Sequence, residues 1–171
     1  MSNVFVVNMR VWGIFLFITL SLTAFSQSTK QYIKAGKKAY NNANYASAVY
    51  YFGKALEQEQ NAKLAWYMAE AARLNHDFEI AEKWYSYIDK NSNDKYPLAP
   101  FWMAMVQKEQ AKYQRAQINF KKYLQKHAAA KDYYTLKARH EVLSCENALF
   151  LTFNKAQDTI LTAPIANFRL I

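Results

Sequence analysis

The chain has 171 residues, of which 52% are hydrophobic and 16% aromatic, so it is long and apolar enough to bury one compact core. This composition excludes an intrinsically disordered protein. Only three glycines and three prolines interrupt a sequence rich in helix-forming residues, which predicts an all-α fold.

Residues 1–26 have the features of a secretory signal peptide. Arg10 precedes an apolar run over residues 11–25, and the small residues Ala24 and Ser26 stand before the expected cleavage point. An uncleaved membrane anchor is the alternative, but polar side chains interrupt the run, which is also shorter than the roughly 20 apolar residues of a spanning helix. We therefore expect the protein to be exported.

Export changes what the net charge of +9 implies. In a cytosolic protein this charge would suggest nucleic-acid binding, but an exported protein rarely meets nucleic acid, and the lysines are spread along the chain. We expect a solvated basic surface, with peripheral attraction to an anionic membrane or an acidic partner as the alternative. Cys145 is the one cysteine, so we expect a small buried residue, with an intermolecular bridge or a reactive thiol as alternatives.

Three stretches repeat one pattern, over residues 44–58, 77–89 and 112–125. In each, an aromatic residue is followed three residues later by alanine and four residues after that by a second aromatic residue. These positions share one face of a helix, so each set forms a stripe that a neighbouring helix can cover. The alanine lets the two helix axes approach, and the rings fill the space beside the crossing. The sets are Tyr45, Ala48, Phe52; Phe78, Ala81, Tyr85; and Tyr113, Ala116, Phe120.

A first helix is predicted upstream of each stretch, again with small residues flanked by larger ones. Short turns at 41–44, 75–77 and 111–112 separate the two helices of each pair, which makes them antiparallel neighbours. The alanines of the three sets lie 33 and then 35 residues apart, a period typical of stacked helical repeats.

Over residues 29–127 the sequence resembles the tetratricopeptide repeat family. The small residue that the family consensus places before the turn falls on Gly36, Ala69 and Ala104. The resemblance implies an α-solenoid of three antiparallel helix pairs. Two departures affect the geometry between pairs: the proline that usually closes a repeat is missing after the first two, and the expected loop at 91–100 is longer than normal.

A capping helix is predicted over residues 131–151, because the last repeat of such an array otherwise exposes its apolar face. Residues 152–171 contain Pro164 and lack a helical period, so we expect an irregular or extended tail. The helical array then comprises residues 27–151. The apolar side of the capping helix is expected to carry Tyr134, Ala138, Leu143 and Ala148.

The capping segment carries a second resemblance, through Ser144, Cys145, Glu146 and Ala148. It is similar to the end of the repeat region in bacterial envelope proteins typical of Bacteroidetes. In these proteins a WD40-like propeller and an OmpA-like peptidoglycan-binding domain follow, and some members serve type IX secretion or gliding machinery. The resemblance implies a protein of the periplasm or outer membrane. Neither later domain is found here, so peptidoglycan binding does not carry over, and a truncated structural fragment of a larger envelope protein is the alternative.

The sequence gives little support for an enzyme. His76, His127 and His140 are isolated, and no glycine-rich phosphate loop, nucleophile motif or cysteine pair for a metal is present. Acidic pairs such as Glu79 and Glu82 fit a solvated helix face better than an acid and base pair. We therefore expect no catalytic residue, no metal and no cofactor.

The remaining functional feature is a binding surface. In the tetratricopeptide arrangement the first helices of successive pairs line a groove, and its aromatic and basic residues suit an acidic or apolar segment of a protein partner. For Trp66 and Phe101 the alternative is packing between helices. Lys37 stands where chaperone-tail clamps have asparagine, so binding of a C-terminal carboxylate is disfavoured. The residues that the resemblance places in the groove are Ile33, Lys37, Tyr40, Trp66, Glu70, Arg73, Phe101, Met105 and Lys108.

Overall fold

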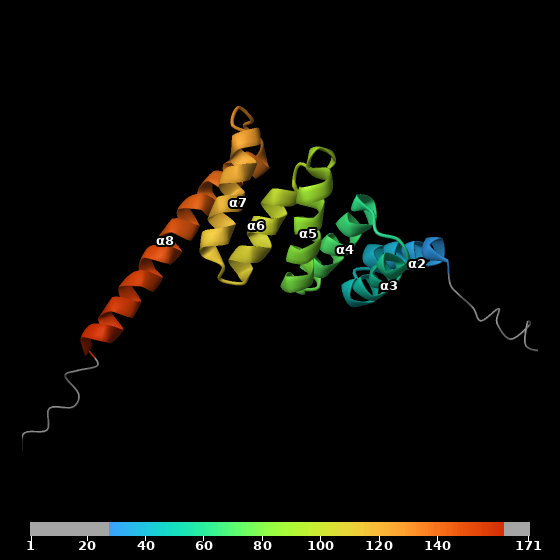
Figure 1. Ribbon diagram of the computed structural model, residues 1–171, viewed down its shortest axis with the longest axis horizontal. Coiled ribbons are helices and arrows are strands. Elements are labelled where there is room, and N and C mark those ends of the chain that lie inside the picture. Colours follow the sequence, from blue (N-terminus) through green and yellow to red (C-terminus); the bar gives the residue numbers. More distant parts are fainter. Residues whose placement is uncertain (1–27, 163–171) are drawn as a thin grey trace, which may run out of the picture.

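The computed structural model describes residues 28–162, which form seven α-helices and one short 3-10 helix stacked in chain order (Figure 1). Each helix packs mainly against the helix before it and the helix after it. This arrangement confirms the predicted all-α array of three helix pairs closed by a further helix. The elements are α2 (Thr29–Asn41), α3 (Tyr45–Gln58), α4 (Ala62–Leu74), α5 (Phe78–Ser92), η1 (Asn93–Lys95), α6 (Ala99–Glu109), α7 (Tyr113–Lys126) and α8 (Tyr133–Thr162).

The turn inside each pair has the same backbone geometry. Ala43, His76 and Ala111 have φ angles of 56°, 63° and 55°, in a region that residues other than glycine seldom adopt. The amide of the residue after each of them donates to a helix carbonyl over 2.9 Å, which closes the C-terminus of the first helix. The three predicted turns are confirmed, and each one reverses the chain within two or three residues.

Small residues lie where the helices cross. Ala48, Ala81 and Ala116 are all 0% exposed, as the repeat pattern predicts. The closest approach is at Gly36 of α2, where an added Cβ atom would lie 2.6 Å from Cε1 of Phe52. A larger side chain at these positions would push the helix axes apart, so the alanines and this glycine set the spacing of the array.

The connection between the second and third pairs is shorter than predicted. α5 continues to Ser92, η1 follows directly, and α6 begins at Ala99 with Pro100 in its first turn. Proline is tolerated there because the first amides of a helix have no partner within the helix. The expected loop over residues 91–100 is therefore wrong, since helical structure occupies most of it.

α8 differs from the prediction in length. It continues to Thr162, so residues 152–162 are helical and the expected irregular tail does not begin at residue 152. No glycine or proline lies in this stretch, and the first helix-breaking residue is Pro164. Residues 163–171 of the tail and the predicted signal peptide lie outside the described residues. Among residues 28–162 no helix has both the length and the hydropathy needed to cross a bilayer.

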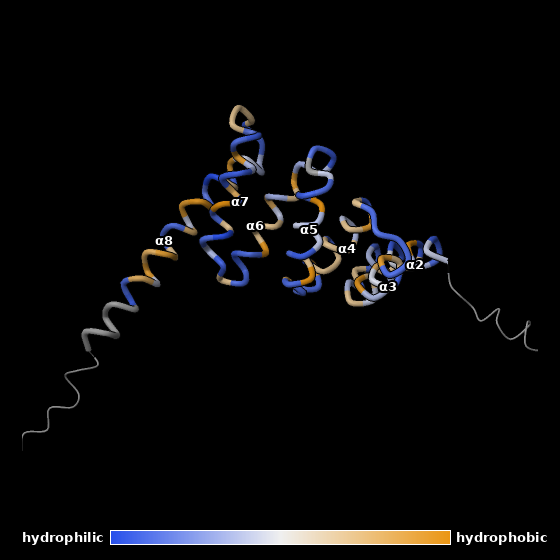
Figure 2. The backbone as a smooth tube through the Cα atoms, viewed as in Figure 1, coloured by the Kyte–Doolittle hydropathy of each residue, from blue (hydrophilic) through white to orange (hydrophobic). Residues whose placement is uncertain are grey.

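The buried face of α8 also differs from the prediction. Ala138 and Cys145 are 0% exposed, whereas Leu143 is 60% exposed. A helix turns by about 100° per residue, so Leu143 lies nearly opposite the face that carries Cys145. The prediction of a buried Cys145 is confirmed, and that of a buried Leu143 is wrong. Figure 2 shows apolar and polar stretches alternating along α8, including the part that projects beyond α7.

Candidate functional site

The first helices of the three pairs, α2, α4 and α6, form one continuous face with two hollows. The first, which we call the α2–α4 hollow, has a volume of about 400 Å³. Aromatic rings form most of its wall, and they are held by contacts with the core: the Tyr67 ring stacks on Phe52 at 5.5 Å, and Trp66 stacks on Tyr96 at 5.3 Å. The residues that line it are Lys37, Tyr40, Asn41, Phe52, Trp66, Tyr67 and Glu70.

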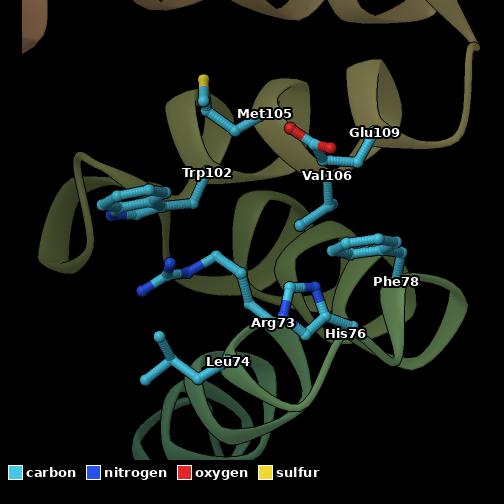
Figure 3. A pocket seen from close by; sticks show the side chains of 8 residues that line it. All are labelled: Arg73, Leu74, His76, Phe78, Trp102, Met105, Val106 and Glu109. Carbon is cyan, nitrogen blue, oxygen red and sulfur yellow. The ribbon is translucent and has the colours of Figure 1, made fainter.

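The second, the α4–α6 hollow, has a volume of about 270 Å³. Figure 3 shows Arg73 extending toward the Trp102 ring, with His76 beside Phe78 on the other side of the opening. The carbon at the centre of the Arg73 guanidinium lies 4.0 Å from the centroid of the Trp102 ring, a cation–π contact that fixes both side chains. The residues that line it are Arg73, Leu74, His76, Phe78, Trp102, Met105, Val106 and Glu109.

A network of three polar side chains separates the two hollows. Glu70 accepts hydrogen bonds from the Tyr85 hydroxyl and from Nη2 of Arg73, the latter over 2.8 Å. Burial raises the pKa of Tyr85, and the charge of Glu70 raises it further, so the hydroxyl stays protonated and remains a donor. The positive charge of Arg73 is therefore balanced inside the protein, and little of it is left for a ligand.

Six of the nine predicted groove residues line these hollows, and a seventh lies close to the core. Lys37, Tyr40, Trp66 and Glu70 line the α2–α4 hollow, whereas Arg73 and Met105 line the α4–α6 hollow. Ile33 is half-buried against the core and lines neither hollow.

The prediction is wrong for Phe101. This residue is 1% exposed, and its ring contacts those of Phe120, Tyr123 and Tyr134. It packs between helices, which is the alternative that the sequence left open for it.

Lys108 does not line a hollow either. It donates to the carboxylate of Glu141 in α8, which also accepts from Nζ of Lys137 over 2.7 Å. Glu141 is only 2% exposed, and burial by itself would raise its pKa. The two lysine hydrogen bonds outweigh burial and hold the pKa of Glu141 below its ordinary value. The ammonium of Lys108 therefore forms an ion pair that joins α6 to α8.

At both positions the next residue along α6 lines the α4–α6 hollow: Trp102 follows Phe101 and Glu109 follows Lys108. The register of the repeat is nevertheless kept, because Met105 lines the hollow as predicted and Ala104 is 0% exposed. Trp102 stands beside Phe101 in the sequence, and no local pattern shows which of the two rings is buried, since the adjacent Trp84 and Tyr85 are both buried.

The described residues contain no group of three or more His, Cys, Asp or Glu side chains that could hold a metal ion. Lys37, Arg73 and His76, which line the hollows, each contact an aromatic ring of the protein.

No protein-family model matches the chain, and no curated protein matches it. Solved structures do. The chain superposes on the Arabidopsis OM64 TPR domain with a TM-score of 0.57 at 18% identity, over 70% of this chain and 94% of that one. It superposes on the Sgt2 TPR domain from Aspergillus fumigatus with a TM-score of 0.58 at 14% identity, over 74% of this chain and 82% of that one. At such identities the likeness shows the fold: the chain is a tetratricopeptide-like α-solenoid of three helix pairs and a capping helix.

Proposed function

We propose that this protein is an exported scaffold that binds another protein of the bacterial cell envelope through the face formed by α2, α4 and α6. The observation that carries the proposal is the pair of aromatic hollows on that face, each held open by contacts with the core. Concave apolar sites with a few fixed polar groups are the usual form of a binding site. Export rests on the signal-peptide features of residues 1–26. The envelope location, with a link to secretion or gliding machinery, rests on the resemblance carried by residues 144–148.

The hollows suit a segment with apolar side chains more than a strongly acidic one. Arg73 is paired with Glu70 and Lys108 with Glu141, so two of the predicted basic groove residues are neutralised within the chain. Lys37 is exposed, and its ammonium lies 4.7 Å from the centroid of the Tyr67 ring at the α2–α4 hollow. We therefore infer a segment with one apolar anchor for each hollow and an acidic residue near Lys37.

A capture experiment with matched variants tests this function. The tagged protein is incubated with envelope extract, and bound proteins are quantified by mass spectrometry for the wild type, Lys37→Glu, Met105→Glu and the control Lys38→Glu. Lys37 and Lys38 are adjacent, exposed residues of α2, but only Lys37 lines a hollow. We expect recovery of the partner to fall about tenfold or more for the two groove variants, because a charge reversal or a buried charge opposes docking.

Lys38→Glu should recover the partner as well as the wild type, since the change in net charge is the same and the site is untouched. Circular dichroism of each variant shows whether the helices are intact. Equal recovery by all four proteins would contradict the proposed groove.

A further inference from the structure

α8 has a second apolar face, whose large side chains are mostly exposed. Its inner face packs against α7 and buries Ala138 and Cys145. On the other side, Leu136, Leu143 and Phe150 are 55%, 60% and 65% exposed. Figure 1 shows α8 continuing past the end of α7. A capping helix normally presents a polar outer face, and this row of large apolar side chains therefore requires another explanation.

Of the six large apolar side chains that are exposed on the described part of α8, three form an evenly spaced central row, Leu136, Leu143 and Phe150. Leu136 and Phe150 each lie seven residues from Leu143, on opposite sides. Seven residues are nearly two turns of an α-helix, so these three side chains share one face. Tyr133 and Leu151, 68% and 66% exposed, lie along one edge of this row, and Phe153, 61% exposed, lies along the other. The evenly spaced row matches itself when two copies lie antiparallel, as a two-fold axis requires.

The charged residues beside the stripe have the same self-complementarity. Arg139 precedes Leu143 by four residues and Glu146 follows it by three, and at about 100° per residue both lie on the same flank of the stripe. In an antiparallel pair this flank brings Arg139 of one copy beside Glu146 of the other.

The Glu146 side chain is 47% exposed; its Oε1 accepts from Nε2 of Gln117 over 2.8 Å and lies 3.5 Å from Nζ of Lys121. Arg139 donates from Nη2 to the carbonyl of Ala128 over 3.0 Å. A carboxylate has two oxygens that accept several hydrogen bonds, so an arginine of a second copy can add to these contacts.

We propose that α8 is a dimerisation helix and that the partner on its outer face is a second copy of this chain. The two helices lie antiparallel, with Leu143 against its own counterpart and Leu136 against Phe150 of the second copy. Arg139 of each copy forms an ion pair with Glu146 of the other, which gives two such pairs across the interface. The hollows of the proposed binding groove lie on α2, α4 and α6, away from this face, so a dimer carries two open grooves and gains avidity for a partner with two matching segments.

Sedimentation equilibrium of the purified protein tests the proposal over a concentration range from about 1 to about 100 µM. We expect the mass to rise from monomer to dimer across this range. Leu143→Glu places two carboxylates at the two-fold axis and should weaken dimerisation at least about 100-fold. Ile118→Glu is the matched control: Ile118 is also 59% exposed, but it lies on α7, and its replacement should leave the dimer unchanged.

A charge exchange tests the antiparallel pairing itself. Glu146→Arg and Arg139→Glu, purified separately, each place like charges together in both pairs of a homodimer, so each should dimerise about tenfold more weakly. Mixed in equal amounts they restore both pairs, and we expect a heterodimer about as stable as the wild-type dimer. The mixing result does not depend on contacts within one chain, such as that between Glu146 and Lys121.

Three outcomes would overturn the proposal. The first is a protein that stays monomeric over the whole range, which would assign this face to another segment of the chain, another protein or a lipid surface. The second is a dimer that survives Leu143→Glu. The third is a mixture of the two charge variants that associates no better than either alone.

Discussion

Alanines pack where α3, α4 and α5 meet, whereas aromatic rings surround one side chain, Phe101, where α6 and α7 meet α8. We call these the alanine-rich cluster and the ring-centred cluster. In the first, eight buried alanines pack beside larger side chains such as Phe52 and Tyr85. In the second, the Phe101 ring lies among those of Trp102, Phe120, Tyr123 and Tyr134. The buried alanines of the first cluster are Ala48, Ala55, Ala65, Ala69, Ala71, Ala72, Ala81 and Ala99, against Ala104, Ala116 and Ala138 in the second.

The last helix of the array is held by different contacts from those that join the helices within the repeats. A small residue recurs at the same position in each pair, so the helices cross in the same way in each. α8 has no following pair, and its contact with the array includes a buried carboxylate, Glu141, that Lys108 and Lys137 neutralise. This buried carboxylate specifies the position of α8, because a slide along the axis would break its hydrogen bond with Lys108 of α6, while Lys137 moves with α8.

The largest expected effect is that of Phe101→Ala, which removes the centre of the ring-centred cluster. The Phe101 ring lies within 6 Å of four other rings, among them those of Trp102 at 5.1 Å and Tyr134 at 5.3 Å. We expect a loss of about 3–5 kcal/mol in the free energy of unfolding, measured by urea denaturation. Hydrogen exchange should locate the loss in α6 to α8, since repeats contact only their neighbours. A loss below about 1 kcal/mol would mean that the site collapses easily and that the rings are not what holds this end together.

The alanine-rich cluster is the part of the fold that the sequence could predict. Ala48 and Ala81 occur at the same place in each repeat, and a local pattern of small and aromatic residues is enough to identify both helices of a pair. The turns follow from the same pattern. Groove residues such as Lys37, Trp66 and Met105 were also predicted, because they follow the consensus spacing of the repeat.

The contacts of the ring-centred cluster with α8 could not be predicted in the same way, because α8 is not one of the repeats, although Ala116 and Phe120 were predicted from the pattern. Phe101 and Trp102 are adjacent aromatic residues, and only the positions of α7 and α8 decide which one is buried. Glu141 follows His140 in a polar stretch and has the sequence pattern of a surface residue. Its burial depends on Lys108, 33 residues away, which no local pattern reports.

A second prediction compares two glycines of the first helix pair, one with close neighbouring atoms and one with space around it. At Gly36 an added Cβ would lie 2.6 Å from Cε1 of Phe52, so Gly36→Ala should destabilise the protein by about 1–3 kcal/mol. At Gly53 the nearest atom to an added Cβ is Cε of Met68, at 3.9 Å, which is ordinary contact. Gly53→Ala should therefore stabilise the protein by up to about 1 kcal/mol through helix propensity. Thermal and urea unfolding of both variants provide the measurement, and the same sign for both would show that close approach does not set the packing of the alanine-rich cluster.

A smaller loss of stability than for Phe101→Ala is expected for Glu141→Gln, which keeps the shape of the side chain and removes its charge. Removing one partner of a fully buried ion pair costs about 3–5 kcal/mol of stability. Lys108 and Lys137 are 26% and 35% exposed, so water replaces part of the lost contact. We therefore expect the free energy of unfolding to fall by about 1–2 kcal/mol at pH 7.

The pH dependence of the stability difference between wild type and Glu141→Gln shows whether the charge of Glu141 causes it. The folded-state pKa of Glu141 lies below its unfolded value, because the lysine hydrogen bonds outweigh the opposing effect of burial. Its contribution to stability is therefore fully present above the unfolded-state pKa, near 4.3, and is lost as the pH falls through the lower folded-state pKa. The gap between wild type and Glu141→Gln should accordingly narrow during acidification, whereas Glu57→Gln, which alters an exposed pair with Lys54 in α3, should lie close to the wild type throughout. A gap that stays constant with pH would mean that the shape of Glu141, and not its charge, holds α8 against the array.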